Sequence, residues 1–116
     1  MNDRLLSMLG LARRAGRLCV GHDASIEAIV RNKAKLCVLC ADASERLKKE
    51  MRHACTYKGK NVAVLTLDCD ILTLSGAIGT KAAVLSVNDK GFAGRIASLH
   101  NEQQSAKGTQ TNEPLR

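Results

Sequence analysis

The chain has 116 residues, the length of a single domain, and 45% of them are apolar, which is enough to build a core. It carries 18 Lys and Arg residues against 11 Asp and Glu residues, a formal net charge of +7. Residues 1–60 hold 13 basic and 6 acidic side chains, whereas residues 61–116 hold 5 of each. This one-sided excess predicts a positive surface that faces a polyanion; charge spread over helix backs for solubility is the alternative.

Aromatic residues make up only 2% of the chain, namely Tyr57 and Phe92. This argues against proteins that stack bases on exposed rings, as RRM sheets or single-strand OB grooves do. No apolar run approaches the roughly 18 residues of a membrane span. The amphipathic stretch "LLSMLGLARRAG" follows Asp3 and makes a poor signal peptide. Five cysteines, an odd number at irregular spacing, fit a reducing cytosol and predict a cytoplasmic protein.

The first segment predicts a helix that begins at Asn2 or Asp3 and stops at Gly16. Its apolar residues recur at helical spacing: Leu5, Met8, Leu9 and Ala12. Residues 17–20 form a short strand candidate that Gly21 ends. Asp23 is expected to cap a second helix. That helix should bury three apolar side chains, Ile26, Ile29 and Val30.

Residues 35–41 form a continuous apolar run, which is typical of a strand covered on both faces. Ser44 or Asp42 is expected to cap a third helix that ends at Gly59. One stripe of this helix is apolar: Leu47, Met51, Ala54 and Cys55. Its opposite face offers Glu45–Lys49 and Arg46–Glu50 as pairs four residues apart, so solvated ion pairs explain its charge.

Residues 62–67 and 82–87 are the remaining strand candidates. Between them, Asp68 is expected to cap a short helix that Gly79 closes. This helix should bury Ile71, Leu74 and Ile78. Asn88 or Asp89 then begins a last helix, which carries Phe92, Ile96 and Leu99. From residue 101 onward the chain has almost nothing to bury, so residues 101–116 are predicted to be a disordered polar tail.

Strands that alternate with helices at this spacing predict an α/β fold with helices on both faces of one sheet. The expected architecture is a three-layer α/β/α sandwich around a central four-stranded mixed sheet. Residues 1–100 should form this single domain.

Cys37 and Cys40 raise the question of redox or metal chemistry. Side chains three apart on a strand point to opposite faces, so these two thiols cannot share a metal or a disulfide without disrupting the strand. A zinc site that adds Cys55 and the three histidines would lack close ligand spacing. The cysteines are therefore predicted to be small core residues, and neither a metal site nor a cofactor is expected.

Signals for catalysis are sparse. The chain lacks a Walker loop, and His22, His53 and His100 have no partners placed for a triad. Asp42, Asp68 and Asp70 follow strands, where they could form an acidic magnesium pocket, but capping explains them more simply. The prediction is a protein without enzymatic activity. A small nucleotide-binding domain or enzyme that uses Asp42 and Asp68 remains the alternative.

Three short segments interrupt the buried framework: residues 21–23, 42–44 and 78–81. Gly21 allows close approach of the backbone, and the N-terminus of the helix that follows offers free amides to a phosphate or a base edge. These loops are therefore the first candidates for a binding site.

The order of several motifs resembles the L7Ae/L30e family of ribosomal proteins, in particular its bacterial YlxQ-type members. The motifs are "GLARRAG", "AKL" followed by "ADAS", "L-x-x-AIG" and "NDKGFA", and the similarity spans about residues 3–99. The resemblance implies a three-layer α/β/α sandwich that binds kinked, structured RNA, typically the kink-turn. A monomeric protein would follow, one that binds ribosomal RNA or takes part in ribosome assembly. A protein adaptor bound to the ribosome is a further alternative.

The family's recognition loop and helix start correspond to residues 21–31. They include Gly21, His22, Asp23, Ala24, Glu27 and Arg31. Asp23, Ala24 and Glu27 stand where the family has Asn, Glu and Lys, whereas Gly21 and the basic Arg31 match. Asp23 can only accept hydrogen bonds, and Glu27 reverses a charge beside the RNA, so weaker binding to a standard kink-turn is expected. His22 is an alternative donor.

The family's second contact is an apolar loop that packs on an extruded base. It corresponds to Ile78, Gly79, Thr80 and Lys81.

Overall fold

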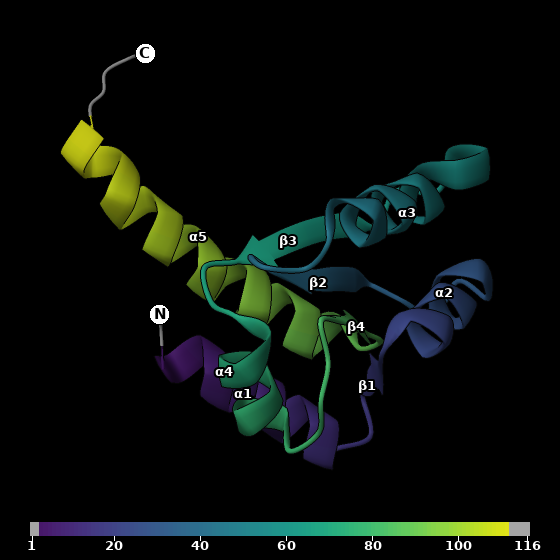
Figure 1. Ribbon diagram of the computed structural model, residues 1–116, viewed down its shortest axis with the longest axis horizontal. Helices are drawn as coiled ribbons and strands as arrows, with labels where there is room; N and C mark the ends of the chain where they lie inside the picture. Colours follow the sequence, from purple (N-terminus) through teal and green to yellow (C-terminus); the bar gives the residue numbers. More distant parts are fainter. Residues whose placement is uncertain (1–2, 112–116) are drawn as a thin grey trace.

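The computed structural model describes residues 3–111 (Figure 1). Its elements in chain order are α1 (Asp3–Arg14), β1 (Leu18–Val20), α2 (His22–Val30), β2 (Leu36–Cys40), α3 (Glu45–Thr56), η1 (Tyr57–Gly59), β3 (Ala63–Leu67), α4 (Ile71–Ile78), β4 (Val84–Val87) and α5 (Lys90–Thr111). No helix in this described part of the chain is both long enough and apolar enough to cross a membrane.

The four strands form one mixed sheet, as the sequence predicts, and their order in the sheet is β1-β4-β2-β3. Strands β2 and β3 are parallel, and β4 is antiparallel to both β1 and β2. The C-terminal ends of β1, β2 and β3 therefore lie at the same end of the sheet as the start of β4. The loops that the sequence singled out, at residues 21–23, 42–44 and 78–81, all adjoin this end.

Helices cover both faces of the sheet, which confirms the three-layer sandwich (Figure 1). Helices α1, α4 and α5 pack on one face, and α2 and α3 pack on the other. Side chains of β2 alternate between the layers: Val38 and Cys40 face the first set of helices, and Cys37 and Leu39 face the second. The predicted opposite orientation of Cys37 and Cys40 is confirmed, and both side chains are fully buried.

Polar side chains mark the helix starts. The Ser44 hydroxyl accepts from the Leu47 amide at 3.1 Å, and Asp89 accepts from the Phe92 amide at 2.9 Å. The prediction that Asp68 caps α4 is wrong, because Asp70 accepts from the Thr73 amide at 2.8 Å. Asp70 directly precedes the first helical residue, which is the position from which a carboxylate reaches the free amides.

Helix α2 differs from the expectation at both ends. Its N-cap is Gly21, without a capping side chain, so Asp23 lies inside the first turn instead of capping it. At the other end Val30, expected in the core, is 62% exposed, and of the three apolar side chains expected there only Ile29 is fully buried. Ile26 is partly buried against the same cluster.

Helix α5 runs on to Thr111, whereas disorder was expected from residue 101. Its first turns are anchored by buried Ile96 and Leu99. Once a helix is nucleated, each further residue adds a hydrogen bond at little cost, and the Glu, Gln and Ala residues that follow favour helix. The rest of the expected tail, residues 112–116, lies outside the described residues.

Candidate nucleic-acid interface

The N-terminus of α2 is an open cluster of backbone amides. Gly21 has φ 97°, a conformation that an L side chain rarely adopts, and its amide donates to the Val84 carbonyl at 2.9 Å. The first intrahelical bond runs from the Ser25 amide to the Gly21 carbonyl at 3.1 Å. Since no side chain caps this turn, the amides of residues 22–24 are available to an anionic group.

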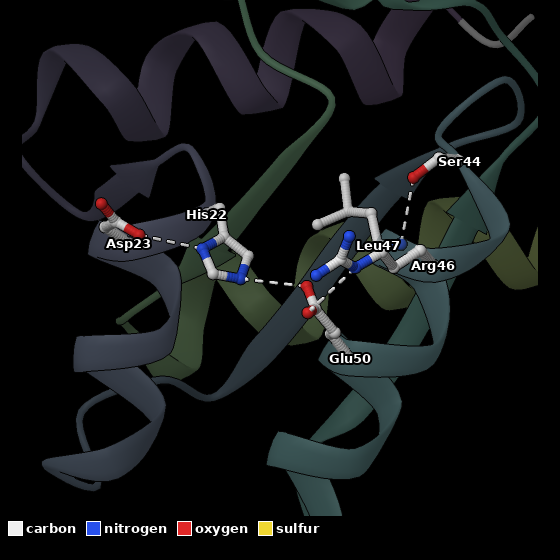
Figure 2. Close-up of polar contacts among 6 residues, drawn as sticks. All are labelled: His22, Asp23, Ser44, Arg46, Leu47 and Glu50. Carbon is white, nitrogen blue, oxygen red and sulfur yellow. Dashed lines mark hydrogen bonds and ion pairs between the residues drawn. The ribbon is translucent and has the colours of Figure 1, made fainter.

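His22 lies between two carboxylates (Figure 2). Its Nδ1 is 2.9 Å from Asp23 Oδ1, and its Nε2 is 3.3 Å from Glu50 Oε1 on α3. The hydrogen bond to Asp23 raises the pKa of His22 above its usual 6.5; burial opposes this shift, and the negative charge of Glu50 adds to it. Arg46 Nε lies 3.7 Å from Glu50 Oε2 and extends the chain of contacts. Both ring nitrogens of His22 are therefore engaged within the protein.

Glu27 and Arg31 form an exposed ion pair along α2, with Arg31 Nε 3.0 Å from Glu27 Oε2. Together with Ala24 and Lys33 they line a shallow cavity of about 260 Å³. Three of the expected RNA-facing residues, Ala24, Glu27 and Arg31, thus lie on one side of α2, whereas His22 lies on the side that faces α3. The carboxylate of Glu27 offsets the charge of Arg31, the arginine that the resemblance places against RNA.

The second expected contact, residues 78–81, is only partly exposed. Ile78 ends α4 and its side chain is buried in the core, so it is not available to pack on a base. The Arg13 guanidinium donates to the Ile78 carbonyl at 2.6 Å. Gly79 then turns the chain at φ 85°, and Lys81 is exposed beyond it.

An exposed apolar residue that the sequence reading missed lies beside this loop. Leu72, 81% exposed, shares a groove of about 650 Å³ with Gly79, Thr80 and Lys81. The signal was present in the spacing, because Leu72 is out of phase with the buried stripe of Ile71, Leu74 and Ile78. The groove is an apolar surface beside the loop whose Ile78 is buried, and Asp42 and Asp70 also line it.

The two expected segments adjoin the same end of the sheet. Gly21 bonds directly to Val84, and Lys81 precedes Val84 by three residues. Cys40 at the end of β2 bonds to the Ala83 carbonyl at 3.0 Å, which places the intervening residues next to the third candidate loop as well. Open amides, an exposed lysine and an apolar groove therefore share one end of the molecule.

Residues 3–95 match the model of the family described as "Ribosomal protein L7Ae/L30e/S12e/Gadd45 family". The chain belongs to this family. It is 31% identical over 97 residues to the RNA-binding protein YlxQ of Enterococcus faecium, an alignment that covers 84% of this chain and 91% of the relative. It is 35% identical over 99 residues to the RNA-binding protein YlxQ of Bacillus subtilis (strain 168), with 79% and 90% covered.

Solved structures show the same fold. A protein of unknown function from Bacillus halodurans C superposes with a TM-score of 0.78 at 30% identity, and the match covers 86% of this chain and 99% of that one. The Giardia lamblia 15.5kD RNA binding protein superposes with a TM-score of 0.68 at 18% identity, with 90% and 92% covered. The second likeness concerns the fold alone.

Two of the three acidic residues that suggested a nucleotide or magnesium site have structural roles in this member of the L7Ae/L30e/S12e/Gadd45 family. Asp42 accepts from the Ile71 amide at 2.9 Å, and Asp70 caps the same helix. Among residues 3–111, no group of three or more His, Cys, Asp or Glu side chains is placed to hold a metal ion.

The buried thiols lie in two separate pairs on opposite faces of the sheet. Contact with Cys55 and burial both raise the pKa of the Cys37 thiol. Burial, with the nearby Cys69 thiol and the Asp42 and Asp70 charges, raises the pKa of Cys40 to about 12. The Cys37 and Cys40 thiols therefore stay protonated and poorly reactive at neutral pH, whereas the hydrogen bond with Cys37 lowers the pKa of Cys55.

Proposed function

We propose that this protein is an RNA-binding protein without enzymatic activity. We further propose that it takes kinked, structured RNA at the end of the sheet where α2 begins. The observation that carries the proposal is the Gly21–Val84 hydrogen bond, which holds the uncapped α2 N-terminus beside the loop that ends at Lys81. The +7 net charge and membership of a family with two RNA-binding YlxQ relatives support it.

In this arrangement the backbone amides of residues 22–24 bind phosphate, as helix N-termini do for many anions. Lys81 and Arg31 add charge, and an unstacked base packs in the groove beside Leu72 and Gly79. A strongly bent RNA presents both groups to one end of a small protein, whereas a straight duplex does not. We therefore favour a kink-turn-like RNA, with a ribosomal or ribosome-assembly RNA in the cytoplasm as its source.

Two side chains oppose tight binding. Asp23 is exposed beside the phosphate-binding turn, and Glu27 holds Arg31 in an ion pair at 3.0 Å. Each carboxylate repels an RNA backbone nearby, so affinity for a standard kink-turn is moderate. The bound RNA is one whose phosphates reach the α2 amides without approaching the Asp23 carboxylate.

A binding assay with two labelled RNAs tests the proposal. A kink-turn RNA and a straight duplex of equal length are titrated at several salt concentrations, and the kinked RNA should bind more tightly. Arg31→Ala should weaken kink-turn binding and lower the salt slope by about one counterion, because that guanidinium meets phosphate. Lys90→Ala, the same loss of charge at the start of α5, is the matched control.

Equal affinity for both RNAs would show that the protein does not recognise the kink. No affinity for either RNA, together with co-sedimentation with ribosomes, would favour the protein adaptor. Stabilisation by a mononucleotide and magnesium in a thermal-shift assay would instead favour a nucleotide-binding domain. An effect of Lys90→Ala as large as that of Arg31→Ala would show that general charge, and not α2, governs binding.

A further inference from the structure

The exposed face of α3 carries a cluster of cations around an aromatic ring. Its members are Lys49, Arg52, His53, Tyr57 and Lys58, here called the α3 surface, and all are exposed. Residues 49, 53 and 57 are spaced four apart and lie in one row, with Arg52 beside them. The row faces away from Met51 and Cys55, which are buried under α3.

Tyr57 is the only tyrosine in the chain, and 53% of it is exposed. The other large aromatic residue, Phe92, packs against the core. The rings of Tyr57 and His53 lie 5.4 Å apart between centroids, and Lys58 Nζ is 5.6 Å from the Tyr57 centroid. Lys58 is held there by a left-handed backbone at φ 54°, a conformation uncommon outside glycine.

Much of the positive charge of this region has no acidic partner. Residues 46–60 contain six basic side chains and one acidic side chain, so they hold most of the net positive charge of the chain. Arg46 pairs with Glu50, and Lys48 pairs with Glu45 at 3.5 Å in place of the expected Glu45–Lys49 pair. Within the described residues, no acidic side chain comes within ion-pair distance of Lys49, Arg52 or Lys58.

The α3 surface is continuous with α2, the helix of the proposed RNA site. Lys60 Nζ donates to Asn32 Oδ1 at 2.5 Å and approaches the Val30 carbonyl at 3.5 Å, which joins the end of η1 to the end of α2. A groove of about 490 Å³ lies between the two helices, and its lining includes His22, Lys49 and His53. An RNA bound at α2 can therefore continue onto the α3 surface.

We propose that the α3 surface binds a single-stranded RNA segment that flanks the structured part of the RNA. An unpaired base stacks on Tyr57, and Lys49 and Arg52 meet the neighbouring phosphates. Proteins that bind single strands with little sequence preference combine cationic side chains that meet the backbone with aromatic rings on which bases stack. Lys58 leaves the ring face when the base arrives, and its ammonium group then meets a phosphate.

An acidic protein would satisfy the cations but would leave the Tyr57 ring unexplained, so single-stranded RNA is the better fit. The low aromatic content of the sequence argued against stacking of bases on exposed rings, but the structure shows that the Tyr57 ring is exposed. The proposal rests on the proposed function only in assigning both surfaces to the same RNA.

The chain reports on this contact by itself, because it contains one tyrosine and no tryptophan. Titration with an unlabelled uridine 12-mer should quench the tyrosine fluorescence of the wild-type protein. With a labelled 12-mer, Tyr57→Ala should lower the affinity about five- to tenfold, as expected for loss of one stacked base. Tyr57→Phe, which keeps the ring, should stay within about twofold, and Leu11→Ala, an exposed apolar residue on α1, is the matched control.

A second titration separates this surface from the α2 site. A kink-turn RNA with a single-stranded uridine extension should bind more tightly than its blunt counterpart, and Tyr57→Ala should remove only that advantage. Unchanged oligouridine affinity in Tyr57→Ala, or loss of affinity in Leu11→Ala as well, would overturn the proposal. If the uridine 12-mer bound and the blunt kink-turn did not, the α2 site would be contradicted but the α3 surface would not.

Discussion

His22 Nε2 lies 3.3 Å from Glu50 Oε1, and this contact joins the first residue of α2 to the middle of α3 (Figure 2). On its other side the imidazole bonds to Asp23 at 2.9 Å. The same histidine lines the groove between the two helices. It therefore couples the turn that offers free amides to the helix that carries the α3 surface, and its protonation bears on both.

Replacing His22 should alter the pH dependence of stability. Its pKa in the folded protein is above 6.5, so the stabilisation is fully present below pH 6.5 and is lost as the pH rises through the raised value. His22→Gln should therefore be more destabilising at pH 6 than at pH 8. With a side chain 47% exposed, the difference should stay below about 1 kcal/mol. Urea unfolding of both proteins at the two pH values measures it.

His53→Gln provides the control for this measurement, since it removes a histidine from the same groove but outside the two carboxylate contacts. Glu50→Gln should reproduce part of the His22→Gln effect, because it removes one of the two negative partners. If His22→Gln lowered the free energy of unfolding equally at pH 6 and pH 8, the contacts to Asp23 and Glu50 would not hold a proton on the ring.

The buried thiols should be inert in the folded protein and structural in role. Cys37, Cys40 and Cys55 are fully buried, and burial raises the pKa of Cys40 to about 12. A thiol reagent at pH 8 should leave these three unmodified until urea unfolds the protein, as peptide mapping by mass spectrometry would show. Cys37→Ala should cost about 1 kcal/mol of stability as a small core truncation and leave RNA affinity unchanged.

Rapid modification of Cys37 or Cys40 under native conditions would contradict this. So would stoichiometric zinc in protein purified without added metal. Cys69, which is only partly buried, serves as the internal control for reagent access.

The Ser44 cap should contribute to the stability of α3. Its hydroxyl satisfies the Leu47 amide at 3.1 Å, one of the free donors of the first turn. Ser44→Ala should therefore lower the free energy of unfolding by about 1 kcal/mol, whereas Ser44→Asp, which can still accept, should change it little. Urea unfolding gives both values. Equal losses in the two variants would show that the hydroxyl bond is not what stabilises the turn.

The framework could be predicted from the sequence because burial repeats with a fixed period. The opposite placement of Cys37 and Cys40 follows from the two-residue period of a strand, and it is found. The choice between Asp68 and Asp70 did not follow from periodicity. Both carboxylates precede the same apolar stripe, and only the point at which the backbone becomes helical selects Asp70.

The binding surfaces were harder to predict because they depend on contacts between distant segments. The spacing of Glu27 and Arg31 allows an ion pair, but the meeting of His22 with Glu50 requires α2 and α3 to pack together. Composition shows that tyrosine is rare in this chain, but it does not show that Tyr57 is exposed among cationic side chains. Arg13 reads as a surface charge, yet it bonds to the Ile78 carbonyl 65 residues away.

Replacing the two carboxylates of α2 is the most direct test of where the RNA lies. In Asp23→Asn with Glu27→Lys, the asparagine can donate as well as accept, and the lysine both meets phosphate and frees Arg31 from its 3.0 Å ion pair. Affinity for a standard kink-turn should rise by about one to a few kcal/mol, and the salt slope should steepen by about one counterion. Titration of the same labelled RNA at several salt concentrations gives both quantities.

Two control variants separate position from net charge. Glu102→Lys makes the same charge reversal on α5, and Lys48→Ala removes a cation whose Nζ is bonded to the Ala41 carbonyl at 2.8 Å. Both should change kink-turn affinity little, because Glu102 lies on α5 and the Lys48 ammonium is already held by the Ala41 carbonyl and Glu45. If Glu102→Lys tightened binding as much as the double variant, net charge alone would explain the gain. If the double variant had no effect while Lys48→Ala abolished binding, the RNA would lie on another face, and the assignment of residues 21–31 would be abandoned.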